Sequence, residues 1–462
     1  MKHRNVRTSL FLVAIMVMIA GFWLFSCKRP QKEVSGAFPH PEWSRDATIY
    51  EVNIRQYTPE GTFRAFEAHL PRLQQMGVKI LWLMPIHPIG VKNRKGSLGS
   101  YYSVQDYLKV NPEFGTENDF RSLVKKVHDL GMYVIIDWVA NHTAWDNPLI
   151  TEHPEWYRKD SAGRIVPPVP DWTDVAGLDY GNTDLRKWMT HSLVWWVKEY
   201  DIDGYRCDVA GMLPVSFWNE AVPEIRKIKP IFMLAEWEAP EAHDTAFDAT
   251  YSWELFYLMY RIAQGKKSTR SLDSLFRHEC STYPSDAYRM RFTSNHDENS
   301  WNGTEYERLG AGVRAFAVLT FTFPGMPLIY TGQEAAMTKR LLFFDKDTVP
   351  WGHYSLAPFY RVLAELKKSH PALWNDLSSG DTLTRVKTKA DSAVYAFLRQ
   401  RDTDIVLVIL NLSDKDQRIT LSGCSLKGNF TEIFSGKERT FPWTEMLALK
   451  PWEYLVFIPE QE

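Results

Sequence analysis

The stretch Asp201-Ile-Asp-Gly-Tyr-Arg-Cys-Asp-Val209 combines an apolar, strand-like run with an arginine and a carboxylate two residues apart. Side chains alternate along a strand, so Gly204, Arg206 and Asp208 are expected to share one face. Burying an arginine and an aspartate at the end of a strand costs free energy unless the two charges pair or have a functional role. Alone, they would indicate only a structural ion pair, but similar strand ends elsewhere in the chain favour a functional role.

Four apolar runs of the chain end in polar groups. These groups are Asp137 with Asn141 and His142, Arg206 with Asp208, Glu236, and Asn295-His296-Asp297. A single acid after a buried strand often caps the next helix. Four acids, an arginine and two histidines at one end of a sheet are hard to explain as caps. The set therefore favours a reaction centre built on carboxylates.

Cleavage of a glycosidic bond needs one ionised carboxylate and one carboxyl group that carries a proton. Arg206 favours the ionised form of its neighbour, which makes Asp208 the predicted nucleophile. Glu236, crowded by other carboxylates, is predicted to have a raised pKa and to act as the general acid. A further acid and two histidines are predicted to stabilise developing charge and to hold sugar hydroxyls: Asp297, His142 and His296.

Short apolar runs that alternate with amphipathic helical stretches must position these groups. Eight runs span residues 49–54, 80–84, 133–137, 202–208, 231–236, 246–251, 291–295 and 327–330. Helical patterns between them include residues 62–76, 116–130, 183–200, 214–227 and 305–319. Eight such units predict an α/β fold, a closed parallel (β/α)8 TIM barrel over residues 41–375, with the active site at the carboxyl ends of the strands. A doubly wound open sheet would give the same alternation.

Two stretches depart from this rhythm. Residues 143–181 separate the third strand from its helix by far more than the usual two to six or so residues, which predicts a small inserted subdomain or lid. Residues 376–462 replace the helical pattern with alternating strand-like runs, which predicts a C-terminal antiparallel β-sandwich domain.

The N-terminus reads as a targeting segment and not as part of the fold. A basic start is followed by an apolar run over residues 10–25, which is short for a membrane span of about 20 residues. Leu24-Phe25-Ser26-Cys27 resembles a bacterial lipobox. We therefore expect a signal peptide at residues 1–27, lipidation of Cys27, a tether at residues 28–40, and a lipoprotein held at the periplasmic or cell-surface side of a bacterial membrane. An uncleaved anchor or an ordinary signal peptide is the alternative.

Composition excludes some classes of function. The formal charge of −2 over 462 residues gives no reason to expect a nucleic-acid partner. Aromatic residues make up 14% of the chain, 18 of them tryptophan, and flat indole faces suit sugar rings. The remaining cysteines, Cys207, Cys280 and Cys424, are too widely spaced to predict a disulfide framework or a zinc site.

The four strand-end motifs, in order and with barrel spacing, resemble those of the α-amylase family (glycoside hydrolase family 13) across about residues 48–352. The resemblance implies a retaining mechanism with a covalent glycosyl–Asp208 intermediate, Glu236 as acid/base and Asp297 as transition-state stabiliser. It also implies that Tyr102, in the stretch Tyr102-Ser-Val-Gln-Asp-Tyr107, stacks under the sugar being cleaved. Residues 324–334 resemble the family's eighth strand.

Some positions depart from the family pattern. Gly211 and Met212 stand where many α-amylases carry a Lys-His pair that contacts the leaving-group sugars. Asn141 matches a calcium ligand of many members, yet the Asp/Asn-rich calcium loop that some members carry after the first strand is absent from residues 58–61. We therefore expect no required cofactor and leave calcium at Asn141 open.

Together these features predict a hydrolase of α-glucosidic bonds, mainly α-1,4, in starch-derived glucans or maltooligosaccharides. A transglycosylase that uses the same site is the alternative. A non-catalytic glucan-binding lipoprotein is the alternative from another class. The sequence does not determine the oligomeric state.

Overall fold

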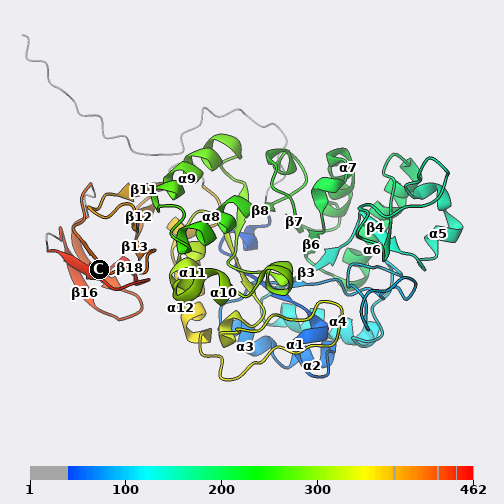
Figure 1. Ribbon diagram of the computed structural model, residues 1–462, viewed down its shortest axis with the longest axis horizontal. Coiled ribbons are helices and arrows are strands. Elements are labelled where there is room, and N and C mark those ends of the chain that lie inside the picture. The colour runs from blue at the N-terminus through cyan, green and yellow to red at the C-terminus, as the bar shows by residue number, and fades with distance from the viewer. Residues whose placement is uncertain (1–39, 378–380, 424–425, 444, 461–462) are drawn as a thin grey trace, which may run out of the picture.

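The computed structural model describes residues 40–377, 381–423, 426–443 and 445–460 (Figure 1). The predicted signal peptide, Cys27 and residues 28–39 of the tether lie outside the described residues. Among the helices that are described, none is long and apolar enough to cross a membrane.

Eight parallel strands close into a barrel, which confirms the predicted fold and excludes the open sheet. In spatial order they are β1 (Ile49–Val52), β2 (Ile80–Leu83), β3 (Tyr133–Trp138), β6 (Gly204–Cys207), β7 (Phe232–Ala235), β8 (Ala249–Tyr251), β9 (Tyr288–Arg291) and β10 (Met326–Tyr330). β10 pairs in parallel with β1 and completes the circle. The barrel lies in the centre of Figure 1.

The seventh strand was misplaced by three residues at the sequence level. It was predicted at 291–295, whereas β9 covers Tyr288–Arg291. Two arginines interrupt its apolar pattern, and Arg291 is nevertheless buried because its guanidinium donates to both oxygens of Glu279, at 2.6 and 2.7 Å. A paired charge can sit in a buried strand, which a hydrophobic pattern does not reveal.

The strands divide their side chains between two cores, as the two-residue period requires. Inward-facing residues such as Ile80, Trp82 and Leu234 fill the barrel, while the alternate positions Leu81 and Leu83 pack into a larger cluster with the surrounding helices. This alternation sends Arg206 inward and Tyr205 outward, where the Tyr205 hydroxyl donates to Leu193 O.

The helices pack around the outside of the barrel and in the loops. They are α1 (Ile54–Tyr57), α2 (Phe63–Glu67), α3 (Leu70–Gln75), α4 (Glu117–Asp129), α6 (Thr183–Tyr200), α7 (Val215–Arg226), α8 (Trp253–Ala263), α9 (Arg270–Thr282), α10 (Glu305–Leu309), α11 (Val313–Thr322) and α12 (Ala357–Ser369). Two predicted helices are each split in two. The helix predicted at 62–76 breaks before Pro71, and the one at 305–319 breaks at Gly310 and Gly312, residues that favour helix ends.

The insertion after β3 is a small subdomain on the right of Figure 1. It contains β4 (His142–Ala144), α5 (Leu149–Glu152) and β5 (Val175–Gly177). β4 and β5 are antiparallel, and His142 is opposite Gly177 in the register. The pairing returns the long loop to the barrel rim where it began.

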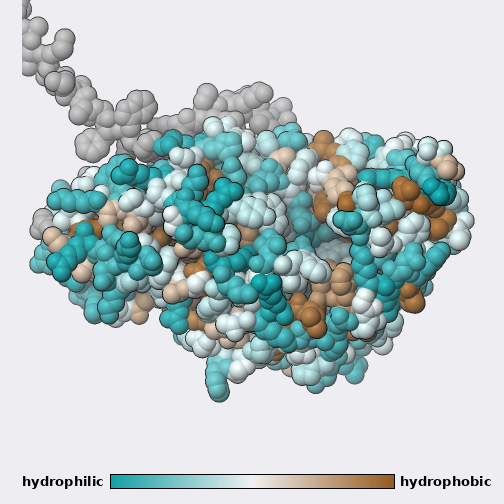
Figure 2. Space-filling view, viewed as in Figure 1, coloured by the Kyte–Doolittle hydropathy of each residue, from teal (hydrophilic) through white to brown (hydrophobic). Residues whose placement is uncertain are grey.

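The C-terminal strands form an antiparallel domain on the left of Figure 1. A six-stranded sheet has the order β11 (Thr382–Val386), β12 (Val394–Arg401), β13 (Asp404–Asn411), β18 (Tyr454–Pro459), β15 (Gly428–Glu432) and β16 (Glu438–Phe441). A two-stranded sheet, β14 (Gln417–Ile419) and β17 (Leu447–Leu449), shares its hydrophobic core. On the face drawn in Figure 2, hydrophobic residues form small separate patches among hydrophilic ones.

Cys280, in α9, is disulfide-bonded, although the spacing of the cysteines predicted no disulfide framework. Spacing along the chain does not predict which cysteines meet once strands and helices have folded. Cys207 is buried in the core, as expected for a small apolar residue.

Candidate active site

Arg206 on β6 is the centre of a buried charge cluster. Its Nη1 donates to Asp137 Oδ1 at 2.9 Å and to Asp208 Oδ1 at 3.0 Å. Its Nη2 lies 2.9 Å from Glu236 Oε2, an ion pair whose angle falls outside hydrogen-bond geometry. The guanidinium is fully buried. One cation therefore gathers carboxylates that come from β3, from the end of β6 and from the end of β7.

The parallel register explains this gathering. Asp137 is the direct neighbour of Arg206 on β3, and Leu234 is its neighbour on β7. Asp208 lies two residues beyond Arg206 and Glu236 two beyond Leu234, so both follow on the same inward face at the carboxyl ends of their strands. The backbone N–H of Val209 also donates to Glu236 Oε2, at 2.7 Å.

The three predicted catalytic acids reach solvent to different degrees. The side chain of Asp208 is 10% exposed, that of Glu236 15% and that of Asp297 39%, whereas Asp137 is fully buried. Asp137 is therefore a structural partner of Arg206, and the other three carboxylates are the ones that a substrate can touch.

Tyr102 and His296 close the cluster on its other side. His296 Nε2 lies 2.8 Å from the Tyr102 hydroxyl and 3.4 Å from Asp297 Oδ2. The Tyr102 hydroxyl in turn donates to Asp137 Oδ2 at 3.1 Å. His296 Nδ1 contacts Glu51 Oε1 at 2.5 Å. Hydrogen bonds thus link His296 and Tyr102 through Asp137 to Arg206, and Asp297 joins this network by its ion pair with His296.

The protonation behaviour of Asp208 differs from the expectation. Burial raises its pKa well above the usual value, and the charges of Glu236, Asp137 and Asp297 raise it further, against the opposing effect of Arg206. Burial likewise raises the pKa of Asp137 to about 6. The charge of one arginine, shared among several acids, lowers their pKa values by less than the loss of surrounding water raises them.

His296 carries a proton at neutral pH. Burial lowers its pKa. The negative charges of Asp297 and Glu51 and the hydrogen bond to Glu51 outweigh this effect and raise the pKa to about 9. Both ring nitrogens therefore act as donors, one to Glu51 and one to the Tyr102 hydroxyl.

His142 lies apart from the carboxylates. It begins β4, and its Nδ1 lies 3.2 Å from Asn141 Nδ2. Burial and the nearby charge of Arg158 lower its pKa to about 4, against an interaction with the Tyr102 backbone that raises it. The ring is therefore neutral at neutral pH.

Three residues of the network were missed at the sequence level. Trp82 Nε1 donates to Asp137 Oδ2 at 3.1 Å, the Tyr251 hydroxyl accepts from Arg206 Nε at 3.2 Å, and Glu51 binds His296. Glu51 had a visible signal, because it is a charged residue inside the apolar run Ile49-Tyr-Glu-Val52. Trp82 and Tyr251 had none, since aromatic residues are ordinary in buried strands.

The surface around Gly211 is apolar. A Cβ atom added at Gly211 would lie 2.5 Å from Cδ1 of the Trp237 indole, so this ring lies directly against the glycine. Met212 is 37% exposed beside it. Trp237 directly follows Glu236 in the sequence.

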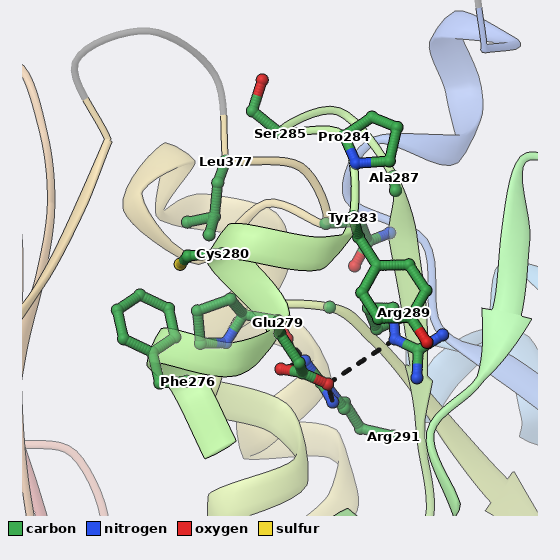
Figure 3. A pocket seen from close by; sticks show the side chains of 13 residues that line it. Phe276, Glu279, Cys280, Tyr283, Pro284, Ser285, Ala287, Arg289, Arg291 and Leu377 are labelled. Atoms are coloured by element: carbon green, nitrogen blue, oxygen red, sulfur yellow. Dashed lines mark hydrogen bonds and ion pairs between the residues drawn. The ribbon is translucent and has the colours of Figure 1, made fainter. Parts of the chain in front are cut away.

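A separate cavity lies where β9 and β10 begin, at the other ends of the strands from Asp208 and Glu236 (Figure 3). Its charged groups already pair with one another, since Glu279 lies between Arg289 and Arg291. Catalytic acids of a parallel barrel are expected at the carboxyl ends of its strands. This cavity is therefore not the candidate active site.

Comparison with known proteins was consistent across sequence and structure. The family model described as "Alpha amylase, catalytic domain" matches residues 40–163 and 170–391, and "Maltogenic Amylase, C-terminal domain" matches residues 384–456. An α-amylase from Haloarcula japonica is 26% identical over 417 residues, which are 86% of this chain. The chain spans only 60% of the length of that relative.

Two solved structures are similar over nearly their whole length. One is a noncanonic maltogenic α-amylase from Thermotoga neapolitana, with a TM-score of 0.82 and 30% identity. The other is an α-amylase from Lactobacillus plantarum, with a TM-score of 0.81 and 30% identity. Each comparison covers 90% of this chain and 99% of the other.

Proposed function

The chain belongs to the α-amylase family of glycoside hydrolases, and on that premise we propose that it hydrolyses α-glucosidic bonds, mainly α-1,4, in starch-derived glucans or maltooligosaccharides. One observation carries the proposal: Asp208 and Glu236, partly exposed and on different strands, both face the guanidinium of Arg206. Two carboxyl groups so placed can act on a single sugar ring from different sides.

In the first step Asp208 is the nucleophile and Glu236 the acid. Arg206 engages Oδ1 of Asp208, which leaves Oδ2 to attack the anomeric carbon. The bond between that carbon and the leaving oxygen breaks as Glu236 gives its proton to the oxygen. The electron pair of the broken bond stays with the leaving sugar, and a glycosyl ester of Asp208 forms.

In the second step Glu236 acts as a base. Its carboxylate takes a proton from water while the water oxygen attacks the anomeric carbon on the face opposite Asp208. The ester bond breaks, Asp208 leaves as a carboxylate, and two inversions give net retention. Asp297, which touches His296, stabilises the positive charge that develops on the sugar in both steps.

Leaving-group chemistry separates the roles of the two acids. α-Maltosyl fluoride needs little protonation to leave, whereas maltotriose needs a full proton transfer. Glu236→Gln should lower kcat on maltotriose by about 10² to 10⁴-fold and lose far less on the fluoride. Asp208→Asn should lose activity on both, because no ester can form.

The matched control is Asp171→Asn, the same change at an exposed aspartate of the inserted subdomain. It should leave both rates unchanged. Normal turnover of maltotriose by a folded Asp208→Asn variant would refute the assignment. Bound glucan without new reducing ends in the wild-type protein would instead support a non-catalytic glucan-binding lipoprotein.

The surface at Gly211 favours glycosyl transfer as the second candidate activity. The indole that lies against Gly211 offers an apolar face to an acceptor sugar, which competes with water for the ester of Asp208. Transfer would appear as products longer than the substrate at high maltotriose concentration. If all products are shorter than the substrate at every concentration, glycosyl transfer is excluded and hydrolysis is the sole activity.

We also propose that the protein is exported and held at a bacterial membrane by a lipid on Cys27. The support is the basic start, the apolar run and the lipobox-like Leu24-Phe25-Ser26-Cys27. The disulfide at Cys280 fits an exported protein, because disulfides persist in oxidising compartments. Labelled palmitate should enter the wild-type protein and not Cys27→Ala, and equal labelling would exclude this site.

A further inference from the structure

Arg158 binds Asn141, a residue whose position matches a calcium ligand in many members of the family. Asn141 Oδ1 accepts a hydrogen bond from Arg158 Nη2 at 3.3 Å. Arg158 Nε donates to the backbone oxygen of Leu178 at 3.0 Å. Oxygen atoms of these two kinds, a side-chain amide and a backbone carbonyl, are calcium ligands in proteins. Here both are bound by one guanidinium.

The residues around Asn141 do not fit a calcium ion. Calcium takes about six to eight oxygen ligands and usually several carboxylates. Within the part of the chain that the structure describes, no group of three or more His, Cys, Asp or Glu side chains could hold a metal. A divalent ion at Asn141 Oδ1 would also lie close to the positive charge of Arg158, which pairs with none of the described carboxylates.

We propose that Arg158 replaces the bound cation and serves as a positioning residue: its guanidinium orients Asn141, and through Asn141 it sets which nitrogen of His142 carries the proton. An arginine can only donate hydrogen bonds, so the atom of Asn141 that faces it must be the oxygen. The amide nitrogen then faces His142 Nδ1 at 3.2 Å. Nδ1 accepts, and the proton of the ring sits on Nε2.

The Asn141 amide nitrogen can only donate, so the ring nitrogen of His142 that faces it must be an acceptor. A protonated imidazole would have no acceptor nitrogen for the Asn141 amide. With Nδ1 as acceptor, Nε2–H is the group that can donate to a sugar hydroxyl. This last step rests on the proposed function, whereas the proton position and the absence of a calcium requirement do not.

Arg158 also joins the inserted subdomain to the barrel. Its backbone N–H donates to Gly177 O at 2.8 Å and its carbonyl accepts from Val166 N at 3.1 Å. Leu178 N donates to Asn141 O at 3.0 Å. The Arg158 side chain therefore connects the subdomain to Asn141, which lies just beyond β3, as a bound ion would.

The wild-type protein tests the first half of the proposal. After dialysis against EGTA and then metal-free buffer, we expect far less than one calcium per chain by mass spectrometry of the metal content. The Tm should be the same in EGTA and in excess CaCl2. One calcium per chain together with a lower Tm in EGTA would overturn the proposal, whatever the enzyme's substrate.

Substitutions test the positioning role. Arg158→Met removes the charge and both donors, so we expect a Tm that falls and is not restored by calcium, and an about tenfold lower kcat/KM, as for the loss of one hydrogen bond. Selective ¹⁵N labelling of histidine, with His142→Gln for assignment, should show the Nδ1 and Nε2 signals of His142 moving toward a mixture of tautomers. Arg158→Lys should restore part of each effect.

Arg164→Met is the matched control, because Arg164 lies in the same subdomain and, among the residues that the structure describes, forms an ion pair with the nearby Asp160 alone. It should change neither the ¹⁵N signals nor kcat/KM. Unchanged His142 signals in Arg158→Met would overturn the positioning role. If no glucan is cleaved by the wild type, the proposed function fails, and the ¹⁵N signals still decide the role of Arg158.

Discussion

At the scale of single residues, His296 shows how a buried charge is kept. Its ring lies between Glu51 on β1 and Asp297 beyond β9, so two carboxylates compensate for the lost water. Its Nδ1–H donates to Glu51, and its Nε2–H donates to the Tyr102 hydroxyl, which in turn donates to Asp137. The network links Tyr102 to the acids, so the orientation of this ring and the charge of the site depend on one another.

Glu51→Gln tests this network through pH. The pKa of His296 is about 9 in the folded protein and about 6.5 when unfolded, so its proton stabilises the fold fully below about pH 6.5 and this stabilisation is lost as the pH rises through 9. Glutamine removes one charge that raises this pKa. We therefore expect the alkaline fall of kcat/KM to move to lower pH, and the Tm to depend less on pH between 6.5 and 9.

The control for this prediction is Glu60→Gln, at an exposed position, which should leave both profiles unchanged. An alkaline limb in Glu51→Gln identical to that of the wild type would show that His296 does not control activity in this range.

At the scale of the elements, the start of β6 leaves no room for a side chain beside β7. Gly204 opens β6 with φ +146°, and a Cβ atom there would lie 1.8 Å from the backbone oxygen of Phe232. That oxygen belongs to the neighbouring strand and cannot move without breaking the ladder. Glycine at this position allows the register that carries Arg206, Asp208 and Glu236 to one face.

Gly204→Ala should therefore destabilise the barrel by more than about 3 kcal/mol, beyond ordinary overpacking, and be recovered largely as insoluble protein. Gly163→Ala is a control at a glycine that also has a positive φ, +79°, but where an added Cβ atom would meet no other atom within 4 Å. It should cost only about 1 kcal/mol. Thermal unfolding followed by circular dichroism measures both, and equal Tm values would refute the steric argument.

At the scale of the whole molecule, the C-terminal domain supports the barrel from the side. Phe359 on α12 stacks on Phe434 with ring centroids 5.6 Å apart and meets Tyr454 at 5.7 Å. Arg399 on β12 donates to Thr322 O at the end of α11, at 3.0 Å. In Figure 1 this domain lies beyond α11 and α12, on the opposite side of the barrel from the inserted subdomain. Its contacts stabilise the fold rather than shape the site.

Phe359→Ala should separate stability from catalysis. Loss of a partly buried aromatic ring at this interface should lower stability by about 2 kcal/mol, below the range for a fully buried phenylalanine. We expect a Tm several degrees lower, with kcat/KM at 25 °C unchanged. Met446→Ala, at a 64% exposed position of the same domain, should change neither. A large fall in kcat/KM at 25 °C would mean that the domain contributes to the site.

Much of the site could be predicted because its acids follow apolar runs directly. The period of two in 202–208 and the abrupt end of 231–236 at Glu236 identify strands and their ends, and in a parallel barrel those ends meet at one rim. The seventh strand was misplaced because Arg289 and Arg291 pair with carboxylates, which local hydropathy does not register. Helix breaks near Pro71 and Gly310 were visible in residue type but were outweighed by the apolar period.

The linear sequence determined the barrel, its inserted subdomain, its C-terminal sheet and the positions of Asp208, Glu236 and Asp297, because period and strand ends are local properties of a chain. Only the tertiary structure decided which residues form pairs. Glu51 meets His296 across 245 positions, and Arg158 meets Asn141 from within a long insertion. Arg206 lowers the pKa of Asp208, as expected, but burial and the neighbouring carboxylates outweigh this effect and raise it. Desolvation and partner choice depend on distances in space, which the order of residues does not contain.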